Sequence, residues 1–297
     1  MSLVATDSLT RPGLSAKART ELQAWSEAED DLLDLGAVAI AFASLRLPEH
    51  NPAVYREHLD RLIAETAELA QRIKPQHVEQ QALLLREVIA LRHNYRGDLE
   101  NYNSPDNANL IRVIERRRGL PVALGIVWLH VARGLGWKAE GLGFPEHFLI
   151  RLEHAGRRLI LDPFHKGDTL GAADLRQRLK SRLGEHAELK PEYSQPVSNK
   201  DVLLRLQNNL YQRYARAGLE EEAVEILESM LLFAPDRARL WQTLGLALAR
   251  MGEEHRAILA LENFLTLGGA DTERHHAATL LEQLKLLTSA ANTWGKT

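Results

Sequence analysis

The last third of the chain repeats itself with a period of 34 residues, and this repeat restricts the possible folds more than any other feature. Small residues at this spacing allow two antiparallel helices to approach closely, and large apolar residues fill the groove between successive pairs. The region is therefore predicted to be all-α. After 34 is added, the positions Gln207, Leu210, Tyr211, Tyr214, Ala223, Leu227, Met230 and Pro235 align with Trp241, Leu244, Gly245, Leu248, Ala257, Leu261, Phe264 and Gly269.

The unit length, the Trp-x-x-Leu-Gly opening of the second copy and the alanine sixteen positions later resemble the tetratricopeptide repeat (TPR). We expect residues 201–297 to contain two TPR hairpins followed by a capping helix over 272–288. The first copy lacks the initial Trp and Gly, and Gly269 stands where a proline normally ends the unit. The alternative is an ordinary helical pair with an accidental match. Tyr211 and Trp241 lie at repeat core positions, so packing is their first role and peptide binding their second.

Charge and hydropathy exclude several classes of partner. The net charge is -3, from 37 Lys+Arg and 40 Asp+Glu, and no block has a marked excess of one sign. Binding to nucleic acid or to an anionic membrane is therefore not expected. The most apolar runs, 35–45 and 120–132, are shorter than the roughly 20 residues that span a bilayer. Since the first twenty residues hold no continuous apolar stretch typical of a signal peptide, we expect a cytoplasmic protein.

The sequence contains no cysteine. This absence excludes disulfides, thiolate ligands for zinc and a cysteine nucleophile together.

Upstream of the repeats, the pattern predicts an α+β domain over 18–190, preceded by a loose tail over 1–17 and followed by a linker or strap over 191–200. Between 138 and 163 the apolar period changes from 3.6 to 2, which indicates strands. The predicted helices cover 52–73, 76–93, 110–118, 121–134 and 172–183, and the predicted strands cover 138–144, 147–153 and 157–163.

A tight turn near His154-Ala155-Gly156 is expected to join the last two strands into a hairpin. With a two-residue turn, positions whose numbers sum to 309 face each other, so His147 lies opposite Asp162. A slip of one residue would leave the two as diagonal neighbours. The same face is predicted to hold Leu149, Arg151, Arg158 and Ile160, and the other face Phe148, Ile150, Leu159 and Leu161.

Four blocks occur in a fixed order: Glu115 to Pro121 (ERRRGLP), Ala132 to Gly136 (ARGLG), Pro145 to Arg151 (PEHFLIR) and Leu161 to His165 (LDPFH). They resemble the transglutaminase-like superfamily, and the whole chain resembles the bacterial SirB-type family, in which such a domain is followed by TPR units. The resemblance implies a transglutaminase/papain-like α+β domain with a helical N-terminal region and a small antiparallel sheet. It also implies a site with a cysteine at a helix start, a histidine on the following strand and an aspartate on the next.

That chemistry requires a helix N-terminus and an imidazole to lower the pKa of the thiol, and a carboxylate to orient the ring. His147 and Asp162 match the histidine and the aspartate. Counting back from Gly136 by the family spacing places the cysteine position at or beside Pro121, and residues 122–126 offer neither thiol nor hydroxyl. The resemblance thus implies a site without its nucleophile, which excludes acyl transfer through a thioester.

The remaining candidates each have a structural alternative. His147 and Asp162 can form a buried, hydrogen-bonded pair that pins the hairpin, or can bind a ligand. His165 could complete a metal site, but the spacing matches no tight metal motif, so neither a metal nor a cofactor is predicted. Arg116, Arg117 and Arg118 could bind a carboxylate or phosphate, although cations in the last turn of a helix also suit its dipole.

Two functional hypotheses follow. In the first, the chain is not an enzyme, and the transglutaminase-like cleft or the TPR groove binds a peptide or a partner protein. In the second, it is a hydrolase or transferase acting on an amide or ester, with His147 as general base and Asp162 orienting it. A buried His147 favours the first and an open one the second. The sequence leaves the partner and the oligomeric state open.

Overall fold

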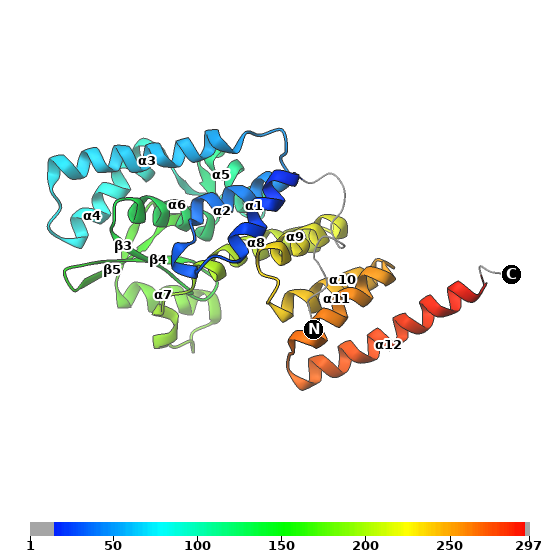
Figure 1. The fold of residues 1–297 in the computed structure, drawn as a ribbon. Coiled ribbons are helices and arrows are strands. Elements are labelled where there is room, and N and C mark those ends of the chain that lie inside the picture. Colours follow the sequence, from blue (N-terminus) through cyan, green and yellow to red (C-terminus); the bar gives the residue numbers. More distant parts are fainter. Residues whose placement is uncertain (1–14, 295–297) are drawn as a thin grey trace. The chain divides into compact units, whose positions relative to one another are not determined.

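The computed structural model describes residues 15–294. They form two compact units, one of residues 28–206 and the other of 207–294 together with the described part of residues 1–27. The α+β class is confirmed, with the sheet in the first unit and helices alone in the second (Figure 1). No helix between residues 15 and 294 combines the length and apolarity that crossing a membrane requires.

Helices make up most of the first unit. The predicted bounds 52–73, 121–134 and 172–183 match α3, α6 and α7, because a capping residue or a first-turn proline marks each start. The helices are η2 (Asp30–Leu32), α2 (Leu35–Leu45), α3 (Pro52–Ile73), α4 (Val78–Leu85), a π-helix (Arg86–Arg92), η4 (Pro105–Ala108), α5 (Leu110–Arg116), α6 (Pro121–Gly134), η5 (Pro163–His165), α7 (Ala172–Leu183) and η6 (Pro191–Ser194).

A four-stranded antiparallel sheet has the order β3-β4-β5-β6, and a separate two-residue parallel pair joins β1 to β2. The last strand of the sheet was not predicted, since three residues are too few to show a period of two. The strands are β1 (Arg96–Gly97), β2 (Arg118–Gly119), β3 (Lys138–Leu142), β4 (Leu149–His154), β5 (Arg157–Asp162) and β6 (Asp168–Leu170).

The register of the β4–β5 hairpin corrects the prediction. Ile150 pairs with Leu161, so facing positions sum to 311 rather than 309. The turn consists of Ala155 and Gly156, both at positive φ (49° and 77°), as a type I′ turn requires. His147 precedes the strand and is not opposite Asp162, which pairs with Asp168 of β6. The two sums differ by two, an even number, so the residues predicted to lie together on each face of the sheet still do so.

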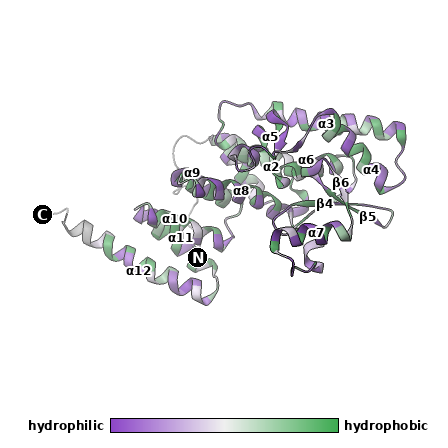
Figure 2. Ribbon diagram, turned by 180° about the vertical axis from the view of Figure 1, so that it is seen from behind, coloured by the Kyte–Doolittle hydropathy of each residue, from purple (hydrophilic) through white to green (hydrophobic). Residues whose placement is uncertain are grey.

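The central helix α6 lies in the core. Its residues from Pro121 to Leu129 are all buried, and it packs against β3, β4, α2, α3 and α5. A Cβ atom at Gly125 would lie 2.4 Å from the ring of Phe148, so the absence of a side chain lets the sheet approach the helix. Figure 2 shows purple and green alternating along α3, as expected for a helix with one buried face.

The other face of the sheet is covered by α7 and the segment after it. Leu175 and Leu179 of α7 pack with Leu142 and Leu149. Part of the predicted linker 191–200 runs along the edge of the sheet beside β3: Val197 N–H donates to the Gly141 carbonyl at 2.9 Å, and Pro196 forms an antiparallel bridge with Leu142. Helix α8 already begins at Asn199.

The second unit contains the repeat helices. Gly245 explains their close packing, because a Cβ atom there would lie 2.8 Å from the side chain of Leu261. Helix α1 packs against α9, and the predicted tail 1–17 lies outside the described residues except for residues 15–17, where Ser15 caps this helix. The bounds are α1 (Ala16–Ser26), α8 (Asn199–Arg216), α9 (Glu220–Phe233), α10 (Ala238–Arg250), α11 (Glu254–Leu267) and α12 (Asp271–Trp294).

Candidate functional site

Asp162 is placed by the local chain direction at the end of β5. As the residue before Pro163, it caps η5, and its side chain accepts hydrogen bonds from the Phe164 N–H at 3.0 Å and the His165 N–H at 3.4 Å. His147 lies in the turn before β4. Arg205 of α8 holds this turn by donating to the carbonyls of Phe144 and His147, at 3.3 Å and 2.6 Å.

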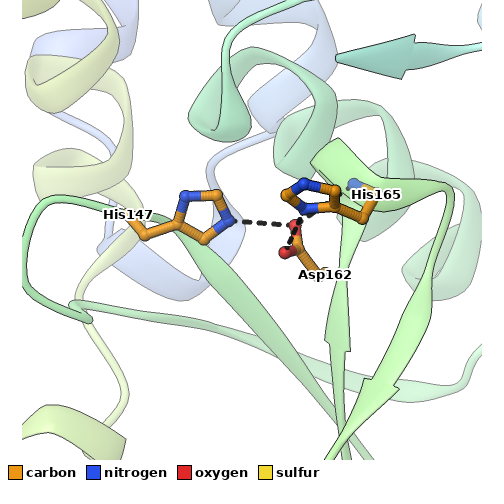
Figure 3. Close-up of side chains that lie close together, drawn as sticks. All are labelled: His147, Asp162 and His165. Carbon is orange, nitrogen blue, oxygen red and sulfur yellow. Dashed lines mark hydrogen bonds and ion pairs between the residues drawn. The ribbon is translucent and has the colours of Figure 1, made fainter. Parts of the chain in front are cut away.

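The Asp162 carboxylate is the centre of a side-chain cluster (Figure 3). His147 Nε2 lies 3.0 Å from Oδ1, and His165 Nδ1 lies 2.7 Å from Oδ2. Arg178 of α7 adds an ion pair, with Nη1 at 2.6 Å from Oδ2. Since an ionised carboxylate only accepts, His147 must donate through Nε2–H, and in the neutral ring Nδ1 is then the acceptor. The carboxylate thus receives donors from α7, from η5 and from the turn before β4.

The cluster is buried at its centre. Asp162 is fully buried, the His147 side chain is 6% exposed and the His165 side chain is 40% exposed. Burial by itself raises the pKa of Asp162, but hydrogen bonds and positive charge from His147, and then from His165, outweigh it and lower the pKa to about 2. Asp162 is therefore ionised across the physiological pH range.

A nucleophile is missing where α6 begins. Pro121 is the first residue of the helix, and its N-cap, Leu120, forms no side-chain hydrogen bond. Residues 121–129 are buried and provide neither a thiol nor a hydroxyl group. Phe148, the residue after His147, packs on Gly125 of the same helix. The histidine turn therefore packs against a helix start that offers nothing for the imidazole to activate.

The same cluster fulfils the spatial requirement for a metal site. Ligand atoms of His147, Asp162 and His165 lie within 4.8 Å of one another. Arg178, however, already brings a positive charge to Asp162 Oδ2 and lies 3.3 Å from His165 Nδ1. A divalent cation would have to share this space with the guanidinium, so the arrangement favours an internal ion pair.

The three consecutive arginines bind different internal partners. Arg116 donates to the buried Asp98 at 2.7 Å, Arg117 to the Tyr95 hydroxyl at 2.5 Å, and Arg118 to Glu100 at 2.9 Å. All of these partners belong to the segment 95–107. Arg117 has positive φ (58°) at the end of α5. The chain turns there, so the Arg117 side chain points in a different direction from those of Arg116 and Arg118. The geometry favours the structural alternative, in which the arginines fasten this segment to the end of α5.

A second buried network surrounds His58 of α3. Its Nε2 accepts from Arg117 Nη1 at 2.6 Å and lies 2.9 Å from the Tyr95 hydroxyl. Burial, then the Arg117 cation and then His93 lower the pKa of His58 to about 3. Tyr95 is fully buried, and burial raises its pKa to about 12. His58 is therefore a neutral acceptor in the folded protein.

This network predicts a pH-dependent stability. Below pH 6.5 the unfolded chain takes up a proton at His58 that the folded chain does not accept, so stability falls as the pH drops from 6.5 towards 3, by at most about 1.4 kcal/mol per pH unit. His58→Gln keeps an acceptor for Arg117 and should flatten this slope in urea unfolding between pH 6.5 and 4. The exposed His186→Gln is the control, and an unchanged slope in His58→Gln would contradict the assignment.

The remaining predicted residues lie apart from this cluster. Trp241 is fully buried in the second unit, and its Nε1–H donates to the Pro235 carbonyl at 2.8 Å, whereas Tyr211 is half-buried. Sequence reasoning missed Arg178 and Arg205. Each is one of several basic residues on an amphipathic helix, so nothing in the sequence distinguished the one that reaches the site.

Comparison with known proteins identifies the family. The model of the transglutaminase-like superfamily matches residues 53–208, more than half of the chain. Protein SirB1 of Salmonella typhimurium is 27% identical over 76% of the chain and 83% of its own length. The chain belongs to the SirB-type family. A tetratricopeptide repeat model matches residues 210–285, as the 34-residue period predicted.

Two further relatives carry names that state no activity. A UPF0162 protein of Xylella fastidiosa strain Temecula1 is 33% identical over 58% of the chain. The match covers 63% of that relative, so the chain spans less than two thirds of its length. A UPF0162 protein of Pseudomonas aeruginosa is 30% identical over 74% of the chain and 82% of its own length. No solved structure matches the chain.

Proposed function

We propose that this SirB-type protein is a non-catalytic protein-binding protein of the bacterial cytoplasm, built from a degenerate transglutaminase-like domain and TPR repeats. The observation that carries the proposal is the use of the His147–Asp162 pair: it is buried, it holds structural elements together, and it lies in a chain without cysteine. An imidazole needs a nucleophile or an accessible water to act as a general base. Its first role here is structural.

The repeat helices offer a surface for a partner. Arg239, Gln242, Leu246 and Arg250 share one face of α10, which we call the α10 stripe, and Trp241 and Leu248 lie buried on the opposite face. Leu246 is 39% exposed. An apolar side chain between two arginines suits a peptide that carries an apolar anchor flanked by carboxylates. The proposed partner is therefore a protein with an acidic, amphipathic segment.

Replacing His147 separates the structural role from a catalytic one. His147→Ala removes a donor from a buried carboxylate and is expected to lower the free energy of unfolding by about 1–3 kcal/mol, measured in urea. Partner binding should persist. If the variant keeps its stability but loses an amidase, esterase or transferase activity that the wild type shows, the catalytic hypothesis replaces this one.

The binding function is tested by co-purification from an extract of the source organism, followed by titration of the purified partner. Leu246→Ser combined with Arg250→Glu should abolish capture of partners that the wild type retains, because it removes both the anchor contact and a positive charge. Leu286→Ser, at a 68% exposed position on α12, is the matched control. If the α10 stripe variant binds partners as well as the wild type, the α10 stripe is not the binding surface. If no protein binds the wild type, the proposed protein-binding function is wrong.

A further inference from the structure

Helix α1 packs on the second unit, although the chain that follows it belongs to the first. The described residues up to Glu27 group with the repeat helices, whereas the chain from Ala28 onward is part of the first unit. Asp30 is fixed in the first unit, because its carboxylate accepts from the N–H groups of Asn199 and Lys200 at 2.9 Å and 2.8 Å. The chain after Glu27 therefore leads away from the repeats, and the contacts of α1 itself hold this helix against α9.

Helix α9, which α1 contacts, is enclosed on every side. All residues from Ile226 to Phe233 are buried, whereas a helix with a single buried face alternates between buried and exposed positions. Within the repeats α9 packs against α10, and it packs against α1 as well. α1 therefore supplies part of the cover of a helix whose apolar side chains are unfavourable in water.

α1 contributes a short row of apolar side chains to this contact. Ala18 and Leu22 are its buried residues, and Trp25 is partly exposed. These positions have the spacing i, i+4 and i+7, the pattern with which amphipathic helices anchor in grooves of other proteins. The helix has 11 residues, fewer than the roughly 12–15 that a helix needs to be even marginally stable alone in water. α1 thus has the properties of a helical peptide that is ordered by the groove it occupies.

From these observations we infer that the α1 side of α9 is a helix-binding groove, which α1 fills in the free protein and from which an amphipathic helix of a partner protein displaces it. The partner helix carries a small residue, a leucine and an aromatic residue at the spacing i, i+4 and i+7, because the groove already accepts this set of side chains. Since α1 is tethered, it competes at a high effective concentration and lowers the apparent affinity of the partner. α1 is thus an autoinhibitory helix.

This inference rests on the proposed protein-binding function, but it concerns a surface other than the α10 stripe. A peptide probe tests the groove without a natural partner. If the peptide fails to bind while partners are captured through the α10 stripe, the proposed function stands and only the groove is rejected.

The probe is a fluorescently labelled peptide of residues 15–27, titrated against the full-length protein and followed by fluorescence anisotropy. Leu22→Asp in the protein places a charge in the buried contact and should release its own α1. The peptide should bind this variant at least about tenfold more tightly than the wild type, where the tethered α1 competes. Ala24→Asp adds the same charge at an exposed position of α1 and is the matched control, which should behave like the wild type.

A second design keeps the test independent of whether Leu22→Asp folds. A protease site inserted between Glu27 and Glu29 allows the folded protein to be cut, which removes the tether and leaves every side chain of the contact unchanged. The cut protein should exchange its N-terminal fragment for the labelled peptide, and hydrogen exchange should show that α10 and α11 keep their protection. A peptide with Leu22→Asp should not bind.

Three results would overturn the inference. The peptide binds neither the cut protein nor a folded Leu22→Asp variant, or it binds the wild type as tightly as it binds these two. In the third result the wild type forms a dimer that Leu22→Asp lacks, which would make a second copy of the chain the occupant of the groove in place of a partner protein.

Discussion

Replacing Asp162 with asparagine is expected to lower the free energy of unfolding by about 3–5 kcal/mol, the usual cost of removing one partner from a buried ion pair. Asparagine carries an NH₂ donor in place of one carboxylate oxygen. This NH₂ would face a side chain that now donates to Asp162, namely His147, His165 or Arg178. It would also leave the Arg178 guanidinium without its counter-ion. One substitution therefore disturbs every member of the cluster, since all the donors converge on one group.

The charge of Asp162 gives the same prediction a pH signature. Its pKa lies near 2 in the folded protein against about 3.9 in an unfolded chain, so the folded state favours the ionised form. The resulting contribution of about 2–3 kcal/mol is present above pH 4 and is lost as the pH falls from 4 to 2. Asp162→Asn should lack this part of the acid transition.

Urea unfolding of the variant at pH 7 and at pH 3 measures both effects. Asp168→Asn is the matched control, since Asp168 faces Asp162 across β5 and β6 but is exposed and, among residues 15–294, forms an ion pair only with Arg86, at 3.4 Å. Its loss should change stability by at most about 1 kcal/mol. Equal losses in the two variants would show that the buried cluster contributes nothing beyond an ordinary surface charge.

Replacing Trp241 with alanine is the second large effect we expect. The side chain is fully buried and donates to the Pro235 carbonyl, so its removal leaves a cavity and an unpaired acceptor. The expected loss is about 3–5 kcal/mol. Hydrogen exchange should show reduced protection across residues 220–267, where the helices that pack around Trp241 lie.

Leu246→Ala is the control for Trp241→Ala, because Leu246 lies on the same helix but is exposed. It should change hydrogen exchange little. If Trp241→Ala leaves the protection of α9, α10 and α11 intact, Trp241 is not the packing centre of the repeat.

The sequence predicted those parts of the fold that local patterns determine. The 34-residue period predicted the helical pairs, and Pro52 and Pro121 marked the starts of α3 and α6. The predicted hairpin register was wrong by two because the turn is formed by Ala155 and Gly156. The alternation of apolar residues could not reveal this error, since it looks the same after any even shift. The helix predicted over 76–93 covers the π-helix at 86–92 without distinguishing it from an α-helix, and β6 was missed because three residues are too few to show a period.

The candidate site was predictable only where a motif identified it. His147 and Asp162 were found through their resemblance to a family pattern, and the structure brings them to 3.0 Å despite the incorrect register. Arg178 and Arg205 reach the site from helices α7 and α8, outside the four motif blocks, so tertiary packing alone selects them. The partners of Arg116, Arg117 and Arg118 were equally hidden, because the segment 95–107 carries no regular pattern.

Arg205 limits where the chain can be cut between the transglutaminase-like domain and the repeats. Helix α8, which opens the repeat array, supplies the Arg205 guanidinium that holds the carbonyls of the histidine turn, and Arg205 lies beyond the end of the linker expected at 191–200. A gene fragment cut at residue 200 would encode a domain that lacks this anchor. A chimera that exchanges the repeat array must therefore retain the first turns of α8 with the upstream domain in order to keep this anchor.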